Sequence, residues 1–257
     1  MTALITGASS GIGLELARIC AEHGHDVVLV ARSEDKLQAL ATELQSRGGR
    51  AQVLAADLSA PGGPKAIVDR LAERGIAVDV LVNNAGYGLF GSFLETSLDT
   101  ELSMIQLNIV ALTELTKRLL PAMVARKSGR ILNVASTAAF LPGPLMAVYY
   151  ATKAYVLSFS EAIANELEGT GVTVTVLAPG PTASGFQAAA SLENSKLVVG
   201  KTLATSREVA VAAYEGLMSG APIVIPGLVN KMTAQMHRLL PRRVVTSLVR
   251  GAQERRH

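Results

Sequence analysis

Two side chains four residues apart, Tyr149 and Lys153, have the chemistry and the spacing of a proton-transfer pair. On a helix such residues share one face, with Cβ atoms roughly 5–6 Å apart. A tyrosine ordinarily ionises near pH ~10, but a neighbouring ammonium favours the phenolate and lowers that pKa, as proton transfer near neutrality requires. Tyr150 is an alternative, although the residue four positions after it is Ala154. The same spacing is common on ordinary helix surfaces, so the pair needs support from other residues.

Further polar side chains stand where predicted strands end. Ser136 follows a strand predicted at 130–135, which places its hydroxyl at the carboxyl edge of the sheet, where α/β proteins bind ligands. Thr137 is its nearest competitor. Asparagines after another strand, predicted at 78–82, can tie backbone segments together beside a ligand or simply form a turn. That second segment reads Asn83, Asn84, Ala85 and Gly86.

A glycine-rich segment joins the first predicted strand to the first predicted helix. Glycines let the backbone turn tightly and let a phosphate approach, while the amides and the dipole at a helix N-terminus favour an anion. No Gly-Lys-Ser/Thr follows, so a nucleoside-triphosphate loop is excluded. At the start of an α/β sheet the segment predicts a dinucleotide site; the alternative is a purely structural turn. It reads Thr6, Gly7, Ala8, Ser9, Ser10, Gly11, Ile12 and Gly13.

The end of the second predicted strand indicates which dinucleotide would bind. An NAD site usually has an acidic residue here for the ribose 2′-hydroxyl. This chain has Arg32, which can form charge-assisted hydrogen bonds with a 2′-phosphate. We therefore expect NADP(H) rather than NAD(H). The alternative is a solvated arginine that opens a helix.

These side chains must be positioned by alternating strands and helices. Short runs rich in Val, Ile and Leu are typical of parallel strands buried on both faces, and the helical segments between them indicate βαβ units. We predict one Rossmann-like α/β domain: a doubly wound parallel sheet of about seven strands with helices on both faces. Strands are predicted at 2–6, 26–31, 51–55, 78–82, 130–135, 172–178 and 223–225, and helices at 12–22, 34–47, 64–74, 98–126 and 148–167.

The domain is expected to span residues 1–227, and two further segments stand out. Residues 183–205 follow a strand end and read as a lid over the ligand, or as surface helices without a role. Residues 228–257 form a basic amphipathic extension that Pro241 would divide into two helices. Asn108 lies inside the helix predicted at 98–126, an unfavourable position that indicates a functional or kink-forming role.

Composition limits the classes of function. The chain has 257 residues with a net charge of +3, and the basic extension alone carries +6. The rest is mildly acidic, and 4% aromatic residues without Trp argue against nucleic-acid binding. A single cysteine, Cys20, excludes a disulfide scaffold and fits a cytoplasmic location. The sequence contains no run of 18 apolar residues, so we predict no membrane-spanning helix. We also predict no metal site.

Together these residues resemble the short-chain dehydrogenase/reductase superfamily, of the NADP-preferring type, from residue 2 to about 227. The resemblance is carried by the loop from Thr6 to Gly13, Asp57, Asn83 to Gly86, Asn108, Ser136, Tyr149 with Lys153, and Pro179 with Gly180. The separation of 13 residues between Ser136 and Tyr149 also matches. The resemblance implies NADP(H) bound by Gly7, Ser9, Ser10, Gly11, Ile12, Gly13, Arg32, Asp57, Leu58, Asn83, Asn84, Ala85, Gly86, Tyr149, Lys153, Pro179, Gly180 and Thr182.

The resemblance also implies a mechanism, written here for carbonyl reduction. Tyr149 would donate a proton to the substrate oxygen, and Ser136 would hydrogen-bond the same oxygen. Lys153 would bind the nicotinamide ribose and lower the pKa of Tyr149, while Asn108 would hold a water of a proton relay. Of the cofactor contacts, Asp57 and Leu58 would flank the adenine, and Pro179, Gly180 and Thr182 would close over the nicotinamide.

The substrate is expected to be a lipophilic ketone, aldehyde or alcohol, because the candidate pocket residues are apolar. An alternative function is a catalytically silent dinucleotide-binding regulatory protein on the same fold. The basic extension could contact an anionic membrane, or it could pack on another subunit, which the family's habit of forming homodimers and homotetramers favours. The candidate pocket residues are Tyr87, Leu89, Phe90, Phe140, Leu141, Leu145, Met146 and Phe186.

Overall fold

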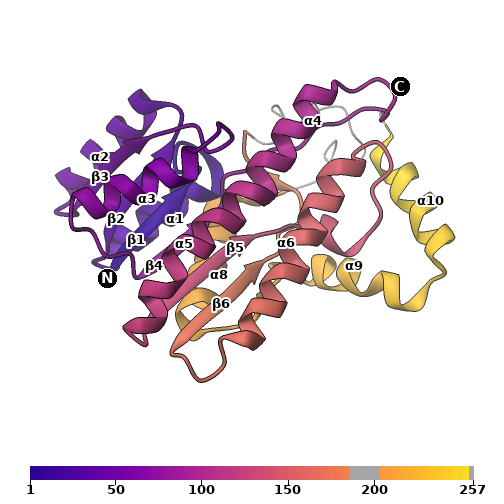
Figure 1. Ribbon diagram of the computed structural model, residues 1–257. Coiled ribbons are helices and arrows are strands. Elements are labelled where there is room, and N and C mark those ends of the chain that lie inside the picture. The colour runs from indigo at the N-terminus through magenta and orange to yellow at the C-terminus, as the bar shows by residue number, and fades with distance from the viewer. Residues whose placement is uncertain (186–202, 255–257) are drawn as a thin grey trace.

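A seven-stranded parallel sheet forms the centre of the computed structural model, which describes residues 1–185 and 203–254 (Figure 1). Its order is β3-β2-β1-β4-β5-β6-β9, and every neighbouring pair is parallel. The order reverses between β1 and β4, as in a doubly wound fold. The strands are β1 (Thr2–Thr6), β2 (Asp26–Ala31), β3 (Ala51–Ala55), β4 (Val80–Asn83), β5 (Gly129–Val134), β6 (Val172–Leu177) and β9 (Ile223–Val224).

The predicted fold class is confirmed, and the strand ends differ from the predicted ones by at most two residues. Helices cover both faces of the sheet (Figure 1). The helices are α1 (Gly11–Glu22), α2 (Glu34–Ser46), α3 (Gly63–Glu73), α4 (Leu98–Ile105), α5 (Leu112–Ala125), α6 (Ala147–Glu166), α8 (Ser206–Ser219), α9 (Leu228–Leu239) and α10 (Arg242–Gln253), with a short 3-10 turn, η2 (Thr137–Phe140).

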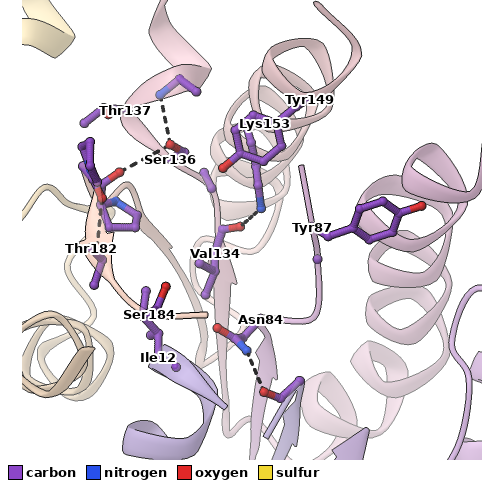
Figure 2. Close-up of a pocket in the computed structure, with 18 of the residues that line it drawn as sticks. Ile12, Asn84, Tyr87, Val134, Ser136, Thr137, Tyr149, Lys153, Thr182 and Ser184 are labelled. Atoms are coloured by element: carbon purple, nitrogen blue, oxygen red, sulfur yellow. Dashed lines mark hydrogen bonds between the residues drawn. The ribbon is translucent and has the colours of Figure 1, made fainter. Parts of the chain in front are cut away.

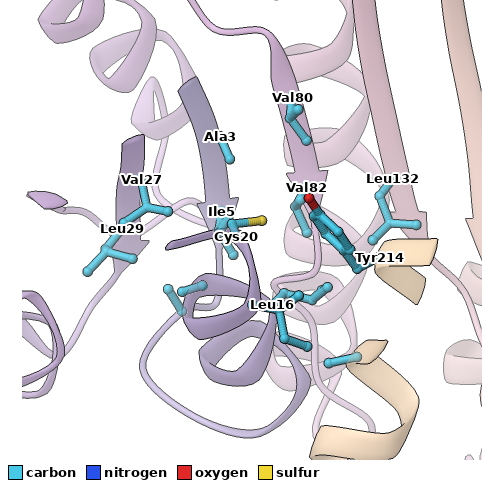
Figure 3. Close-up of a cluster of buried hydrophobic side chains, with 14 of the residues drawn as sticks. Ala3, Ile5, Leu16, Cys20, Val27, Leu29, Val80, Val82, Leu132 and Tyr214 are labelled. Carbon is cyan, nitrogen blue, oxygen red and sulfur yellow. The ribbon is translucent and has the colours of Figure 1, made fainter. Parts of the chain in front are cut away.

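Two buried clusters hold the layers together. Because side chains alternate along a strand, Ala3 and Ile5 of β1 pack with α1, α2 and α8 on one face (Figure 3). Leu4 of the same strand packs with α3, α5 and α6 on the other face. This double burial explains why the strands lack the polar alternation of a half-exposed sheet.

Local sequence signals set several helix ends. Pro64 stands in the first turn of α3, where its missing N–H costs no hydrogen bond. Thr205 and Glu208 form a capping box at the start of α8, with the Thr205 N–H donating to the Glu208 carboxylate at 2.8 Å. Gly220 ends α8 with φ +72°, the left-handed conformation common after a helix.

The stretch predicted as a single helix over 98–126 contains a π-helical segment. α4 and α5 are joined without a break by η1 (Gln106–Ala111), and Asn108 lies within it. The residues at both junctions of η1 keep right-handed helical backbone angles, so the helical pattern of the sequence continues through it without a visible break. π-helical segments inside α-helices often occur at functional sites.

The C-terminal extension folds onto the body of the chain (Figure 1). It forms two helices, α9 and α10, on either side of Pro241, as the sequence predicts. α9 packs against η2, and α10 buries Val245, Val249 and Gln253. Within the described ranges, none of the helices combines the length and the apolar character needed to span a bilayer.

The predicted lid falls mainly outside the described residues. Its described ends form a small two-stranded sheet of β7 (Thr182–Ala183) and β8 (Ala204–Thr205). Residues 186–202, which include the pocket candidate Phe186, lie outside the described part of the chain.

Candidate active site

A cavity of about 1040 Å³ opens at the carboxyl ends of the parallel strands (Figure 2). It is lined by residues that follow β1, β2, β3, β4, β5 and β6, so segments far apart in the sequence meet at one edge. Open α/β sheets bind ligands at this edge, near the reversal of strand order. The predicted site residues that line it are Gly7, Ser9, Ser10, Gly11, Ile12, Arg32, Asp57, Leu58, Asn84, Ala85, Gly86, Ser136, Tyr149, Lys153, Pro179, Gly180 and Thr182.

The loop after β1 has a backbone that only glycine adopts readily. Gly7 and Gly11 have φ of +68° and +59°. A Cβ on Gly13 would collide with the Gly7 carbonyl and the Asn84 side chain, although Gly13 itself does not line the cavity. These glycines let the loop turn tightly into the N-terminus of α1, a position that favours a bound phosphate group.

Thr6 and Asn84 clamp this loop to the end of β4. The Thr6 hydroxyl donates to the Val82 carbonyl at 3.1 Å and accepts from the N–H groups of Asn84 and Ala85 at 2.9 and 3.0 Å. In return, Nδ2 of Asn84 donates to the Thr6 carbonyl at 2.9 Å. The clamp fixes the two strands on either side of the reversal, where the cavity lies.

Arg32 and Asp57 mark the end of the cavity near β2 and β3. Hydrogen bonds from Ser59 hold the pKa of Asp57 below its ordinary value, and the positive charge of Arg32 lowers it further. Arg32 is exposed at the rim, while Leu58 is buried in the wall. This end therefore offers one cation, Arg32, to a ligand.

The phenol of Tyr149 points toward the hydroxyl of Ser136 (Figure 2). Burial raises the pKa of Tyr149, and a hydrogen bond with Ser136 opposes that rise. The Ser136 hydroxyl is itself held from two sides, because it accepts from the Ala138 N–H at 3.1 Å and donates to the Pro179 carbonyl at 3.4 Å. Two hydroxyl groups from distant segments thus meet inside the cavity.

Lys153 lies beneath Tyr149 on α6. Its Nζ is 5.8 Å from the centre of the Tyr149 ring and donates to the Val134 carbonyl at 2.8 Å. Burial lowers the pKa of Lys153 to about 8. The sequence predicts that Lys153 lowers the pKa of Tyr149, but here burial raises that pKa, because desolvation penalises the phenolate more than its neighbours stabilise it.

Asn108 is buried behind the residues that line the cavity. Its Nδ2 donates to the Tyr87 carbonyl at 3.0 Å and to the Thr152 hydroxyl at 3.1 Å, and its Oδ1 accepts from the Tyr87 N–H at 3.2 Å. A Cβ on Gly86 would meet both Asn108 Oδ1 and Lys153 Nζ, at 2.9 and 3.6 Å. Asn108 is therefore close to Lys153, but it does not line the cavity, and its role in a water relay stays a prediction.

Asn83 also lies outside the cavity lining. Its Nδ2 donates to the Thr116 hydroxyl at 3.0 Å and to Asn133 Oδ1 at 2.9 Å, and Asn133 continues to Ser160 at 2.8 Å. This buried chain joins β4, β5, α5 and α6. The side chain of Asn83 thus ties the sheet to its helices, and Asn84 is the member of the pair beside the cavity.

The segment after β6 is supported by the C-terminal extension. Thr182 is buried, and its hydroxyl donates to the Gly180 carbonyl at 2.9 Å. The Asn230 side chain of α9 fills the space that a Cβ on Gly180 would need. Helix α9 thus packs behind the loop that is predicted to close over a nicotinamide.

Sequence reasoning missed the part of the cavity wall that the extension supplies. The sequence shows that residues 228–257 are amphipathic. It does not show whether their apolar face packs against a membrane, another subunit or the same chain. Of the predicted pocket residues, Tyr87, Leu141 and Met146 line the cavity, Leu89, Phe90 and Leu145 line a neighbouring one, and Phe140 packs in the core. The lining residues from the extension are Val229, Asn230, Thr233, Met236, Leu248, Val249 and Ala252.

The sequence and the fold both resemble known proteins. A family model described as short chain dehydrogenase matches residues 1–195. The ketoacyl reductase HetN of Nostoc is 38% identical over 70% of this chain and 62% of its own length, and human 17-beta-hydroxysteroid dehydrogenase type 3 is 37% identical over 69% and 57%. The chain thus spans about three fifths of these relatives. A short-chain dehydrogenase from Sphingobium yanoikuyae, solved with NADPH, covers 98% of both chains at 34% identity and a TM-score of 0.83.

Proposed function

Because this chain belongs to the short chain dehydrogenase family, we propose that it is an NADP(H)-dependent oxidoreductase that interconverts a lipophilic ketone or aldehyde and its alcohol. The observation that carries the proposal is the meeting of Tyr149, Ser136 and Lys153 in the cavity that also contains the glycine-rich loop. A dinucleotide lying between the loop and these side chains would bring its redox carbon to them.

The residues present fit a nicotinamide dinucleotide. The left-handed glycines Gly7 and Gly11 shape the turn that leads into the N-terminus of α1, where the backbone N–H groups and the helix dipole favour a pyrophosphate. Arg32 is placed to pair with a 2′-phosphate, which favours NADP(H) over NAD(H). When bound, NADPH supplies the hydride that reduces the carbonyl carbon.

The remaining chemistry belongs to side chains of α6, of the segment after β5 and of η1. Tyr149 gives its hydroxyl proton to the carbonyl oxygen in reduction and takes it back in alcohol oxidation. Ser136 hydrogen-bonds the same oxygen and holds it near the phenol. Lys153 binds the nicotinamide ribose, and Asn108 holds a water of the proton relay. Burial raises the pKa of Tyr149, which favours the protonated phenol that donates in the direction of reduction.

The substrate class rests on the apolar cavity wall. Tyr87, Leu141 and Met146, together with Leu248 and Val249, surround the space next to Tyr149. Pockets of this kind bind apolar ligands with a few fixed polar contacts. The names of the relatives, a ketoacyl reductase and a hydroxysteroid dehydrogenase, support a lipophilic carbonyl substrate.

We expect a cytoplasmic homodimer or homotetramer. Val110 and Tyr155 are exposed apolar residues on η1 and α6, and they are candidates for subunit contact. The apolar face of α10 packs against the rest of the same chain. This packing favours neither a membrane nor another subunit as the partner of that face.

The proposal is tested by following NADPH absorbance with a panel of lipophilic ketones and aldehydes, and NADP⁺ with the matching alcohols. We expect turnover with several carbonyl compounds and a preference for NADPH over NADH. Binding of NADPH without turnover of any compound in either direction would instead support the catalytically silent regulatory protein.

A further inference from the structure

The last helix, α10, forms part of the cavity wall. Leu248, Val249 and Ala252 line the same cavity as Tyr149 and Ser136. Residues at these spacings share one face of a helix, and here that face is apolar. The alanine stands out because it is the smallest side chain that α10 turns toward the cavity.

The wall is anchored by a buried amide. Gln253 is 0% exposed, and its side chain lies near enough to the Tyr150 phenol to oppose the rise in the Tyr150 pKa that burial causes. Because a buried amide is costly away from polar partners, this proximity favours one position of α10 over its alternatives. Val249 and Val245, one and two turns earlier, are buried on the same side of the helix.

Tyr150 is itself fixed from two other directions. Its ring packs edge-on against the Tyr149 ring, with centroids 6.1 Å apart and an interplanar angle of 77°. The same ring fills the space that a side chain at Gly143 would require. Gln253, Tyr150 and Tyr149 therefore form a continuous chain of contacts from the extension to the reacting hydroxyl.

We propose that α10 sets the size of the substrate group that the active site accepts, with Ala252 as the limiting position and Gln253 as the residue that positions the wall. The inference rests on the proposed carbonyl reduction. A bulky apolar substituent of the carbonyl compound packs against Leu248 and Ala252 while its oxygen meets Tyr149. A larger side chain at 252 removes that room.

The first test compares Ala252→Phe with Gly251→Phe on two ketones, cyclohexanone and decalone, which differ by one fused ring. Gly251 has open space around it and does not line the cavity, so it is the matched control. We expect Ala252→Phe to lower the ratio of kcat/KM for decalone over cyclohexanone by roughly 10–200-fold, the range for steric discrimination in an apolar pocket. Gly251→Phe should leave the ratio unchanged, and both variants should bind NADPH.

A ratio that stays unchanged in Ala252→Phe, or that changes equally in both variants, would overturn the inference and leave the proposed function standing. Absence of turnover of every compound in the carbonyl panel, these two ketones included, by the unaltered enzyme would overturn both. These two failures are therefore distinguishable in the same experiment.

The second test addresses Gln253. We expect Gln253→Leu to raise KM for decalone at least ~10-fold with little change in kcat, and to have almost no further effect in a Tyr150→Phe background, because coupled residues are not additive. A loss of folding stability alone would not change KM in this selective way. Equal effects of Gln253→Leu in both backgrounds would show that the contact between Gln253 and Tyr150 does not position the wall.

Discussion

The side chain of Asn230 occupies the space in which a Cβ on Gly180 would stand. Gly180 lies in the loop after β6, beside Ser136, whose hydroxyl donates to the Pro179 carbonyl. Asn230 is held in place because its Nδ2 donates to the Pro226 carbonyl at 2.6 Å. Helix α9 and the loop after β6 are therefore closely packed against each other. A substitution in one of them should change the stability of the other.

This fit predicts a rescue. Gly180→Ala should lower the free energy of unfolding by about 1–3 kcal/mol, the usual cost of overpacking, and should weaken NADPH binding. Adding Asn230→Gly frees the space and should restore part of both quantities. Urea unfolding and NADPH titration of the two single variants and the double variant measure this coupling. Strictly additive losses would mean that the two side chains do not compete for space.

Replacing Tyr149 tests the proton donor. Tyr149→Phe should lose at least ~100-fold in kcat, the scale of general acid catalysis, because no proton is supplied to the substrate oxygen. NADPH binding should persist, since the ring remains. Tyr155→Phe is the matched control on α6, because the Tyr155 hydroxyl contacts Thr113 on the outer surface. Equal turnover in Tyr149→Phe and the unaltered enzyme would remove Tyr149 from the mechanism.

Burial of Lys153 predicts a pH dependence of stability. Its pKa is lowered to about 8 in the folded chain, while an unfolded lysine keeps a pKa near ~10.4. Between these values the unfolded state binds the extra proton, so this lysine's contribution to stability rises with pH and is complete above the unfolded pKa. For the protein without cofactor, the free energy of unfolding relative to Lys153→Met should therefore rise by on the order of 3 kcal/mol across this window.

Unfolding both proteins in urea from pH 7 to pH 10.5 measures that difference. Other titrating groups are present in both chains, so their contributions largely cancel. A difference that stays flat with pH would show that Lys153 keeps an ordinary pKa.

Arg32 is expected to select the cofactor. Arg32→Asp should shift the ratio of kcat/KM for NADPH over NADH toward NADH by roughly 10–100-fold, because one charged hydrogen-bond partner of the 2′-phosphate contributes about 1.5–3 kcal/mol. Lys36→Asp makes the same change of charge on exposed α2 outside the cavity lining, and it should leave the ratio nearly unchanged. An equal shift in both variants would indicate a long-range effect of charge rather than a contact.

The sequence was sufficient for features that depend on short-range pattern. The apolar runs predicted all seven strands of the sheet, and the polar residues at their ends predicted which side chains line the cavity. It failed where two neighbours have equal chemistry. Asn83 and Asn84 differ only in which face of the strand end they reach, and this alternation is fixed by the register of β4.

Long-range packing was also beyond the sequence. An amphipathic pattern is the same whether the apolar face packs on a membrane, on another subunit or on the same chain. The pattern of the extension therefore did not reveal that α10 covers Tyr150. The raised pKa of Tyr149 was missed for the same reason. Residue spacing predicts a nearby ammonium, whereas the desolvation that raises the pKa of Tyr149 depends on everything packed around the phenol.

The clamp between Thr6 and Asn84 has a consequence for how the chain acquires its cofactor site. A fragment that ended at residue 80 would contain every glycine of the loop and the whole of β1, β2 and β3, yet the Thr6 hydroxyl would lack the two N–H donors that follow β4. During synthesis or refolding, dinucleotide affinity should therefore appear only after the fourth strand has docked across the centre of the sheet, and not when its own βαβ segment first forms.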